Sequence, residues 1–425
     1  MGGVDAINLG RRIQGDIYGA GVYGRTPVVP VEPGRLREAT RKAMSDRAFA
    51  YVDGSAGRGR TNDANVEAFG RYRAVPRMLR DVRERDLGVD LVGRRYAHPL
   101  LLAPIGVLEM AHLQAERAVA KASVATQTPM IHSTQASVAM EEVAAELDET
   151  PHWYQLYWSN DDDLARSLVQ RAEACGAEAV VVTLDTHLMG WRPEDLDLGH
   201  LPFARGQGLA QYLSDPVFMA RVEERAARGS ARPTERPTPA AARSLVSIAR
   251  HYPGELRENL RSPLPRAAVE TFLDVFPSSG LTWDDLAKLR EWTSLPILLK
   301  GLQSIDDVRL AADQGLDGIV VSNHGGRQVD GAVASLDVLA SLGDEVGDLT
   351  VLFDSGVRSG SDVFTALALG ADAVILGRPY VYGLALAGAE GVQAVVEHTL
   401  AELDLTMALT GHASVAEIHR GALAR

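Results

Sequence analysis

The chain has 425 residues, of which 46% are hydrophobic and 23% charged, a composition typical of a folded globular protein. Acidic residues outnumber basic ones and give a formal net charge of -13, which disfavours nucleic acid and anionic membranes as partners. The single cysteine, Cys175, excludes an intrachain disulfide and a cysteine-cluster metal site, and the lack of a signal-peptide pattern or a long apolar run predicts a cytoplasmic protein.

The first part of the chain contains two stretches with helical spacing of apolar residues. They are LREATRKAMSD at 36–46 and NDANVEAFGRY at 62–72. We therefore expect residues 1–98 to form a helical cap on the bottom or the side of the domain that follows, residues 99–425.

Eight short apolar runs predict buried parallel strands, because they lack the alternation of a half-exposed strand. They lie at 99–106, 129–134, 152–158, 179–185, 296–301, 318–326, 350–356 and 373–379. Stretches with helical spacing separate most of them, at 115–127, 137–147, 161–176, 304–315 and 359–370. This alternation predicts an α/β fold, a (β/α)₈ or TIM barrel.

Two of the predicted helices have clear start and stop signals. In SIDDVRLAADQG, Ser304 is suited to cap the helix, acidic residues follow it, and Gly315 ends it. In SGSDVFTALALG we expect Ser361 and Gly370 to serve in the same way.

The fourth and fifth predicted strands are separated by more than a hundred residues, far more than a barrel loop needs. Part of this gap, RVEERAARGSARPTERPTPAAARSL at 221–245, is rich in Arg, Ala and Pro and predicts a mobile stretch. An insertion after a strand opens on the catalytic face of a barrel, so we expect residues 193–280 to form a lid. A spacer without a role is the alternative.

Polar residues follow the predicted strands and should meet in one mouth. They are Gly106, Ser133, Gln155, Tyr157, Thr183, Asp185, Lys300, Ser322, His324, Arg327, Asp354, Arg358, Gly377 and Arg378. The motifs DSGVRSG and ILGRP combine glycines with Arg358 and Arg378 on the last two strands, where barrels commonly bind phosphate.

The segment SNHGGRQ at 322–328 suggests acid-base chemistry. Arg327 could bind a carboxylate while a neutral His324 takes a proton from the neighbouring carbon, and Asp185 could hold the imidazole in the required tautomer. Lys300 could stabilise an anionic ring or form a structural salt bridge, and the spacing does not decide between them. A metal site is disfavoured, because no second histidine stands at ligand spacing and the arginines would repel a cation.

Several of these motifs identify a resemblance. SNHGGRQ, DSGVRSGSDVFTALALGADAVILGRP, LLKG and YQLYW resemble the FMN-dependent 2-hydroxy acid oxidase and dehydrogenase family, from about Leu36 to about Ile418. DIYG, AYVDGSAG, LLAPIGVLEMAH, TLDTHLMGWRPEDLDLG, DPVF and the long insertion look most like the lactate 2-monooxygenase branch of that family.

The resemblance implies a role for each matching position. His324 would be the catalytic base and Asp185 its partner; Arg192 and Arg327 would hold the substrate carboxylate; Tyr51 and Tyr157 would contact the carboxylate and the hydroxyl or oxo oxygen. The flavin ring and ribityl chain would contact Pro104, Ile105, Gly106, Ser133, Gln155, Thr183, Lys300 and Ser322, and its phosphate would contact Asp354, Ser355, Gly356, Val357, Arg358, Gly377 and Arg378.

Three positions depart from the family pattern. Gln135 stands where relatives carry a larger or apolar residue of the side-chain pocket, so its amide puts lactate itself in doubt as the substrate. His187 replaces a proline or tryptophan, with a structural role expected, and Ser55 replaces a glycine, with no effect expected.

The resemblance implies an FMN enzyme that uses O₂ to oxidise a small L-2-hydroxy acid, with oxidative decarboxylation in the manner of lactate 2-monooxygenase. The alternatives are an oxidase that releases the 2-oxo acid and hydrogen peroxide, a dehydrogenase with another electron acceptor, and a flavin-binding protein without turnover. A homotetramer or larger homo-oligomer is also implied.

Overall fold

The computed structural model describes residues 8–229 and 238–424. Eight parallel strands close into a barrel in which each strand pairs with the next along the chain and β11 pairs with β4. The strands are β4 (Leu100–Leu102), β5 (Met130–Ser133), β6 (His152–Leu156), β7 (Val180–Thr183), β8 (Ile297–Leu302), β9 (Gly318–Val321), β10 (Thr350–Phe353) and β11 (Ala373–Leu376). All eight predicted strands and the TIM barrel are confirmed. Nearly every strand residue is buried, which is why the sequence shows continuous apolar runs.

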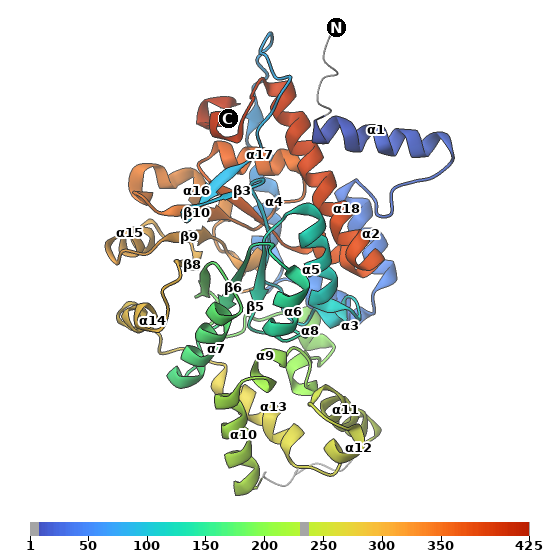
Figure 1. Cartoon of the computed structure of the whole chain (residues 1–425), viewed down its shortest axis with the longest axis vertical. Helices are drawn as coiled ribbons and strands as arrows, with labels where there is room; N and C mark the ends of the chain where they lie inside the picture. Colours follow the sequence, from blue (N-terminus) through green and yellow to red (C-terminus); the bar gives the residue numbers. More distant parts are fainter. Residues whose placement is uncertain (1–7, 230–237, 425) are drawn as a thin grey trace.

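Helices surround the barrel (Figure 1); all but the last return the chain from the end of one strand to the start of the next, and the last follows the final strand. They are α5 (Ala115–Thr126), α6 (Met140–Leu147), α7 (Asp162–Ala174), α14 (Leu286–Trp292), α15 (Ile305–Asp313), α16 (Ser335–Leu342), α17 (Gly360–Ala368) and α18 (Arg378–Thr410). The helical spacing in the sequence predicts α5, α6, α7, α15 and α17 but not α14, α16 or α18. No helix within 8–229 or 238–424 is both long enough and apolar enough to cross a bilayer.

The helix caps agree with the sequence in one case and differ in the other. Ser304 accepts a hydrogen bond from the backbone N–H of Asp306, as expected, and Gly315 follows α15 with a φ of 66°. At α17, however, the cap is Ser359, which accepts from the N–H of Asp362. The prediction of Ser361 was wrong because the chain becomes helical at Gly360, so Ser361 already lies in the first turn.

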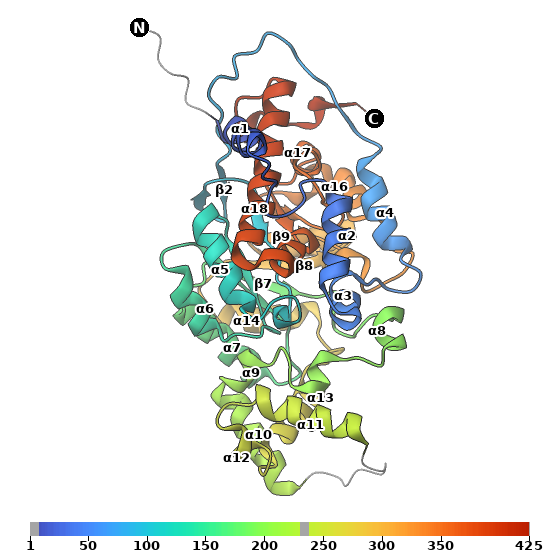
Figure 2. The same ribbon diagram turned by 90° about the vertical axis from the view of Figure 1, so that its right-hand side faces the viewer.

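The N-terminal region contributes α1 (Leu9–Val22), α2 (Pro33–Ala43), α3 (Asp46–Asp53) and α4 (Arg60–Phe69), with short strands β1 (Arg73–Ala74), β2 (Val89–Leu91) and β3 (Arg94–Tyr96). Helices α1 and α2 pack along α18 on the side of the barrel (Figures 1 and 2). Helices α3 and α4 instead reach the carboxyl end of the strands, where Asn65 of α4 hydrogen-bonds Asn323 after β9. The expected cap on the bottom or side is therefore only part of the arrangement.

The insertion after β7 is largely helical. Its elements are α8 (Pro193–Asp197), the 3₁₀ turn Pro202–Arg205, α9 (Ala210–Leu213), α10 (Pro216–Arg228), α11 (Pro239–His251), α12 (Leu256–Asn259) and α13 (Leu264–Val275). Helices α10 to α13 form a lobe beside the barrel (Figures 1 and 2). Helices α10 and α11 occupy both ends of the stretch predicted to be mobile, and the rest of that stretch, 230–237, lies outside the described residues.

An aromatic cluster holds the lobe together and joins it to the barrel. The rings of Phe272 and Phe276 stack with centroids 5.5 Å apart, and Phe272 also contacts Tyr212 at 5.0 Å. Phe276 meets Tyr157, which follows β6, edge to face at 5.6 Å. Such pairs add to the stabilisation that comes from burial, so the cluster fixes the insertion over the end of the barrel.

Candidate active site

A cavity with an empty volume of about 1070 Å³, which includes space open to solvent, lies at the carboxyl ends of the barrel strands. Most of the site residues predicted from the sequence line it: Tyr51, Pro104, Ile105, Gly106, Gln135, Tyr157, Thr183, Arg192, Lys300, His324, Arg327, Asp354, Ser355, Gly356, Val357, Arg358, Gly377 and Arg378. Ser133, Asp185 and Ser322 do not belong to the lining but hydrogen-bond residues that do. Gln155 is also outside the lining, and its Oε1 accepts hydrogen bonds from Ser133 and Thr134.

The sequence analysis missed several lining residues. They are Val52, Ala103, Thr186, Met189, Phe203, Phe276, Gly325 and Ile375. Phe203 and Phe276 belong to the insertion, and Met189 and Thr186 lie on the loop that leads into it. The insertion therefore supplies apolar wall to the cavity, which neither composition nor strand position indicates.

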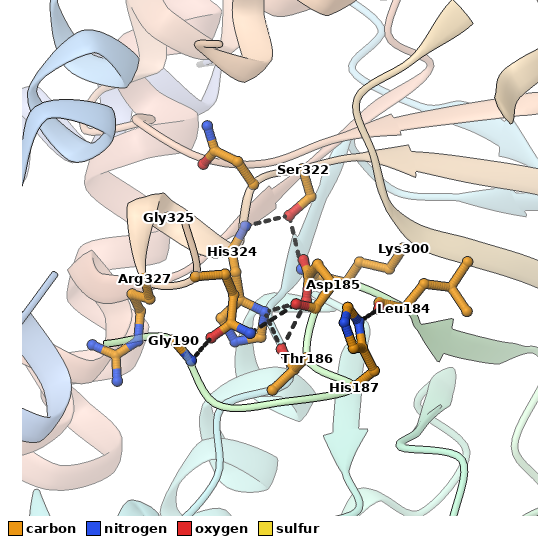
Figure 3. Close-up of polar contacts among 12 residues, drawn as sticks. Leu184, Asp185, Thr186, His187, Gly190, Lys300, Ser322, His324, Gly325 and Arg327 are labelled. Carbon is orange, nitrogen blue, oxygen red and sulfur yellow. Dashed lines mark hydrogen bonds and ion pairs between the residues drawn. The ribbon is translucent and has the colours of Figure 1, made fainter. Parts of the chain in front are cut away.

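His324 and Asp185 form a close polar pair at the cavity (Figure 3). His324 Nδ1 lies 2.7 Å from Asp185 Oδ1, and the Thr186 hydroxyl donates to the same oxygen at 2.8 Å. Since an ionised carboxylate can only accept, Nδ1 carries the hydrogen and Nε2 keeps its lone pair. Asp185 packs directly on Gly301, whose φ is 109° and where a Cβ would come within 2.8 Å of the Asp185 Cβ. The pair thus presents a basic nitrogen with fixed orientation.

Burial and neighbouring charges set the protonation of this pair. Burial lowers the pKa of His324 below its ordinary value, and Asp185 only partly offsets that effect. Burial also opposes ionisation of Asp185, but the His324 and Lys300 charges outweigh it and lower the Asp185 pKa to about 2. At neutral pH the site therefore holds a neutral imidazole braced by a carboxylate, the state required of a general base.

Two arginines face the cavity beside the histidine. Arg192 Nη2 donates to Gln328 Oε1 at 2.8 Å, and Arg327 Nη1 donates to the Gly54 carbonyl at 2.7 Å while its guanidinium lies over the Tyr51 ring. In the described part of the chain, neither forms an ion pair with a carboxylate. Burial, and after it the Arg327 charge, lowers the Arg192 pKa to about 10. The Asp195 carboxylate interacts with both guanidiniums at longer range. Two adjacent cations with no direct ion-pair partner among the described residues are suited to bind an anionic group.

Two tyrosines complete this end of the cavity. Burial raises the pKa of both Tyr51 and Tyr157. Their hydroxyls therefore remain protonated in the ordinary pH range and can donate hydrogen bonds to an oxygen of a bound ligand.

The neighbouring strands β6 and β7 carry buried polar atoms without partners in the described part of the chain, one of them on Thr183 in the cavity lining. Gln155 Nε2 and Thr183 Oγ1 are buried at the ends of β6 and β7 and have no hydrogen-bond partner among the described residues. Nearby, Lys300 Nζ lies 2.9 Å from Ser322 Oγ and 3.1 Å from Asp354 Oδ2. Burial opposes the lysine charge, but Asp354 and Asp185 raise the pKa of Lys300 above its ordinary value. Unpaired donors beside a fixed cation suit a polar, electron-accepting ring.

Glycines and arginines also line the cavity. Gly106 packs against Gln135 so closely that a Cβ would lie 3.0 Å from its Cβ and carbonyl oxygen, and Gly356, with φ 92°, lies against the backbone of Asn65. Arg358 Nη1 donates only to the Val357 carbonyl. Arg378 lines the cavity, and its three nitrogens also donate to the carbonyls of Val52, Gly54 and Gly325, with Nη1 donating to Asn62 as well. It therefore joins the end of α3 to the turn that carries His324.

The three departures from the family pattern lie in different surroundings. Gln135 is buried and lines the cavity, and its Nε2 has no partner among the described residues. His187 is exposed, and its Nδ1 lies 3.3 Å from the Leu184 carbonyl, outside the cavity lining. Ser55 is buried and also outside the lining. Of the three, only Gln135 can contact a ligand in the cavity.

Comparison with known proteins identifies relatives along nearly the whole chain. The model of the FMN-dependent dehydrogenase family matches residues 40–425. The FMN-dependent alpha-hydroxy acid dehydrogenase qulF of Penicillium citrinum is 40% identical over 421 residues, which is 99% of this chain and 96% of that protein. The L-lactate oxidase of Lysinibacillus sphaericus is 37% identical over 407 residues, 94% of each chain. A crystal structure of mandelate oxidase superposes with a TM-score of 0.73 at 33% identity and covers 93% of this chain and 98% of that one.

Proposed function

The chain belongs to the FMN-dependent dehydrogenase family, and on that premise we propose that it oxidises a small L-2-hydroxy acid and decarboxylates the product in the same cavity, as a lactate 2-monooxygenase does. One observation supports the oxidation most directly: the buried Arg192 and the half-buried Arg327, without ion-pair partners among the described residues, face the cavity that is also lined by His324, whose Nδ1 is held by Asp185. This arrangement fits a carboxylate with a reacting carbon and hydroxyl next to it.

The residues of the cavity fit FMN. Gln155 and Thr183, with Lys300, would hold the polar edge of the ring, and the backbone of Pro104 to Gly106 would support it. Asp354 to Arg358 with Gly377 and Arg378 would hold the phosphate. When bound, FMN supplies a two-electron acceptor that passes the electrons to O₂. Lys300, charged and fixed between Ser322 and Asp354, would stabilise negative charge on the ring without reorganising.

The chain's own groups would then perform the acid-base work. Arg192 and Arg327 bind the substrate carboxylate and thereby set the hydroxyl and the Cα–H near His324 Nε2. Tyr51 and Tyr157 donate to the substrate oxygens. His324 accepts one substrate proton on Nε2, and Asp185 stabilises the imidazolium that forms.

Decarboxylation depends on keeping the 2-oxo acid and hydrogen peroxide together. Peroxide attacks the C2 carbonyl, the bond from C2 to the carboxyl carbon breaks and the O–O bond breaks, which yields the shortened acid, CO₂ and water. Phe203 and Phe276 of the insertion and Met189 line the cavity with apolar wall, and their closure over it would exclude water and retain peroxide. The insertion, residues 193–280, is on this view the lid.

An oxidase that releases the 2-oxo acid and peroxide is the second candidate, because relatives such as the L-lactate oxidase are named as oxidases. The family also includes proteins named dehydrogenases. An enzyme that releases the 2-oxo acid and passes the electrons to an acceptor other than O₂ is therefore a variant of this second candidate. A cytoplasmic location and a homotetramer or larger homo-oligomer belong to the proposal as well.

Product analysis distinguishes these candidates. We expect L-lactate in air to give acetate and CO₂ with little free peroxide, and a panel of larger 2-hydroxy acids would show how far Gln135 and the lid restrict the side chain. Pyruvate with an equal amount of hydrogen peroxide would establish the oxidase instead. Failure of every 2-hydroxy acid to bleach the bound flavin without oxygen would contradict both.

The pH dependence of kcat/KM should show whether His324 acts as a neutral base. We expect kcat/KM for the 2-hydroxy acid to be flat near pH 7 and to fall as the pH drops through the pKa of His324, because protonation removes the Nε2 lone pair. Since burial lowers that pKa from 6.5, the midpoint of the acidic limb should lie below pH 6.5. An acidic limb centred above pH 7 would show that His324 is not the neutral base in the free enzyme.

A further inference from the structure

One side chain outside the cavity lining connects three parts of the site. Gln328, next to Arg327, uses both ends of its amide. Its Oε1 accepts from Arg192 Nη2 at 2.8 Å and from the Gly190 N–H at 3.3 Å. Its Nε2 donates to the carbonyls of Asp185 at 2.7 Å and Leu188 at 2.9 Å. The full hydrogen-bonding capacity of the amide is therefore directed at the loop 185–192 and its terminal arginine.

The same loop is also fitted to the backbone around Gln328. Gly190 lies beside the turn that carries His324 and Arg327 (Figure 3). A Cβ at Gly190 would come within 2.5 Å of the Arg327 carbonyl oxygen and 2.6 Å of that of Gln328. Only glycine permits this approach, and Arg192 Nε adds a hydrogen bond to the Arg327 carbonyl at 3.1 Å.

We propose that Gln328 is a positioning residue that fixes the substrate-binding Arg192 relative to the Asp185–His324 pair. The loop 185–192 carries Asp185 at its start and Arg192 at its end, and Gln328 contacts both: the backbone of the first and the guanidinium of the second. The base His324 and the carboxylate-binding Arg192 are thereby held in fixed positions relative to each other. This inference deepens the proposed function and rests on it for the identity of the group that Arg192 binds.

Glutamine is the side chain that meets these requirements. A methionine of similar length would offer neither the acceptor to Arg192 nor the donors to the two carbonyls. A glutamate would keep the acceptor, but its carboxylate would face the carbonyls of Asp185 and Leu188 and would pair with Arg192 in competition with the substrate. The neutral amide holds Arg192 while leaving its charge available.

The test compares binding of a carboxylate with binding of an uncharged analogue in the FMN-loaded enzyme. We expect Gln328→Met to weaken pyruvate binding, measured from the flavin absorption spectrum, by about tenfold, because a hydrogen bond to a charged group is lost. Gln328→Glu should weaken it further. The ratio of kcat/KM for lactate to that for lactamide should fall in both variants, since only lactate carries the carboxylate, while FMN content stays unchanged.

Matched controls distinguish a loss of Arg192 positioning from a general loosening of the protein structure. Gly190→Ala should reproduce the loss of preference for lactate over lactamide, whereas Gly19→Ala, in α1 and far along the chain from the site, where a Cβ would meet no atom within 4 Å, should not. Gln303→Met, which removes one hydrogen bond to the Val333 carbonyl, should also be silent. Equal losses for lactate and lactamide in the Gln328 variants, or unchanged pyruvate binding, would overturn the proposal. Absence of pyruvate binding in the unmodified enzyme would instead contradict the carboxylate site of the proposed function.

Discussion

Replacing His324 with alanine should give a yellow, FMN-loaded protein whose flavin is reduced by a 2-hydroxy acid about a thousandfold more slowly than in the unmodified enzyme. The expectation follows from geometry and protonation. Asp185 holds Nδ1 at 2.7 Å and leaves Nε2 as the basic atom of the site, and a positioned general base contributes roughly 10² to 10⁴ in rate. The measurement is anaerobic stopped-flow reduction of the bound flavin at saturating substrate.

The matched control is His187→Ala. His187 lies on the same loop as Asp185, but it is exposed and its Nδ1 lies near a backbone carbonyl, not in the cavity. It should retain nearly full reduction. Near-normal reduction in His324→Ala would remove His324 from its role as base, whereas loss of FMN from that variant would show a mainly structural role.

The barrel could be predicted from the sequence because its strands are buried on both faces, so Val180–Thr183 and Gly318–Val321 appear as unbroken apolar runs. The His324–Asp185 pair could be predicted from residues that follow two different strands, because the carboxyl ends of all barrel strands lie around one opening. Arg192 and Tyr51 could not be found in this way. They come from a loop and from α3, and only the resemblance to a known family indicated them.

The cavity walls contributed by the insertion could not be predicted for a related reason. Phe203 follows no strand, and Phe276 follows α13, so no local pattern relates them to the barrel mouth. The position of Phe276 depends on its contact with Tyr157, and that of Phe203 on its contact with Phe272, which also packs on Tyr212. These contacts join segments far apart in sequence. The composition of 221–245, rich in arginine, alanine and proline, likewise gave no helix signal, although α10 and α11, of 13 residues each, occupy its two ends.

Replacing Arg327 with methionine should lower kcat/KM for a 2-hydroxy acid by about two to three orders of magnitude. Loss of one partner from a buried, hydrogen-bonded charge pair costs roughly 2–5 kcal/mol, and Arg327 also lies over the Tyr51 ring. Arg327→Lys should recover only part of the loss, because an ammonium cannot form the two parallel hydrogen bonds of a guanidinium. Arg166→Met, which removes an exposed pair with Asp163, should be nearly silent.

Arg327→Met should also move the alkaline limb of the pH dependence of activity to higher pH, which a folding defect would not do. The pKa of Arg192 is lowered to about 10 by burial and then by the charge of Arg327. Removing that charge should raise the Arg192 pKa, so activity that falls above about pH 10 in the unmodified enzyme should persist to higher pH in Arg327→Met. An alkaline limb that stays in place, or moves to lower pH, would mean that the two guanidiniums do not share one carboxylate site. The proposal that Arg192 and Arg327 together orient the substrate would then be wrong.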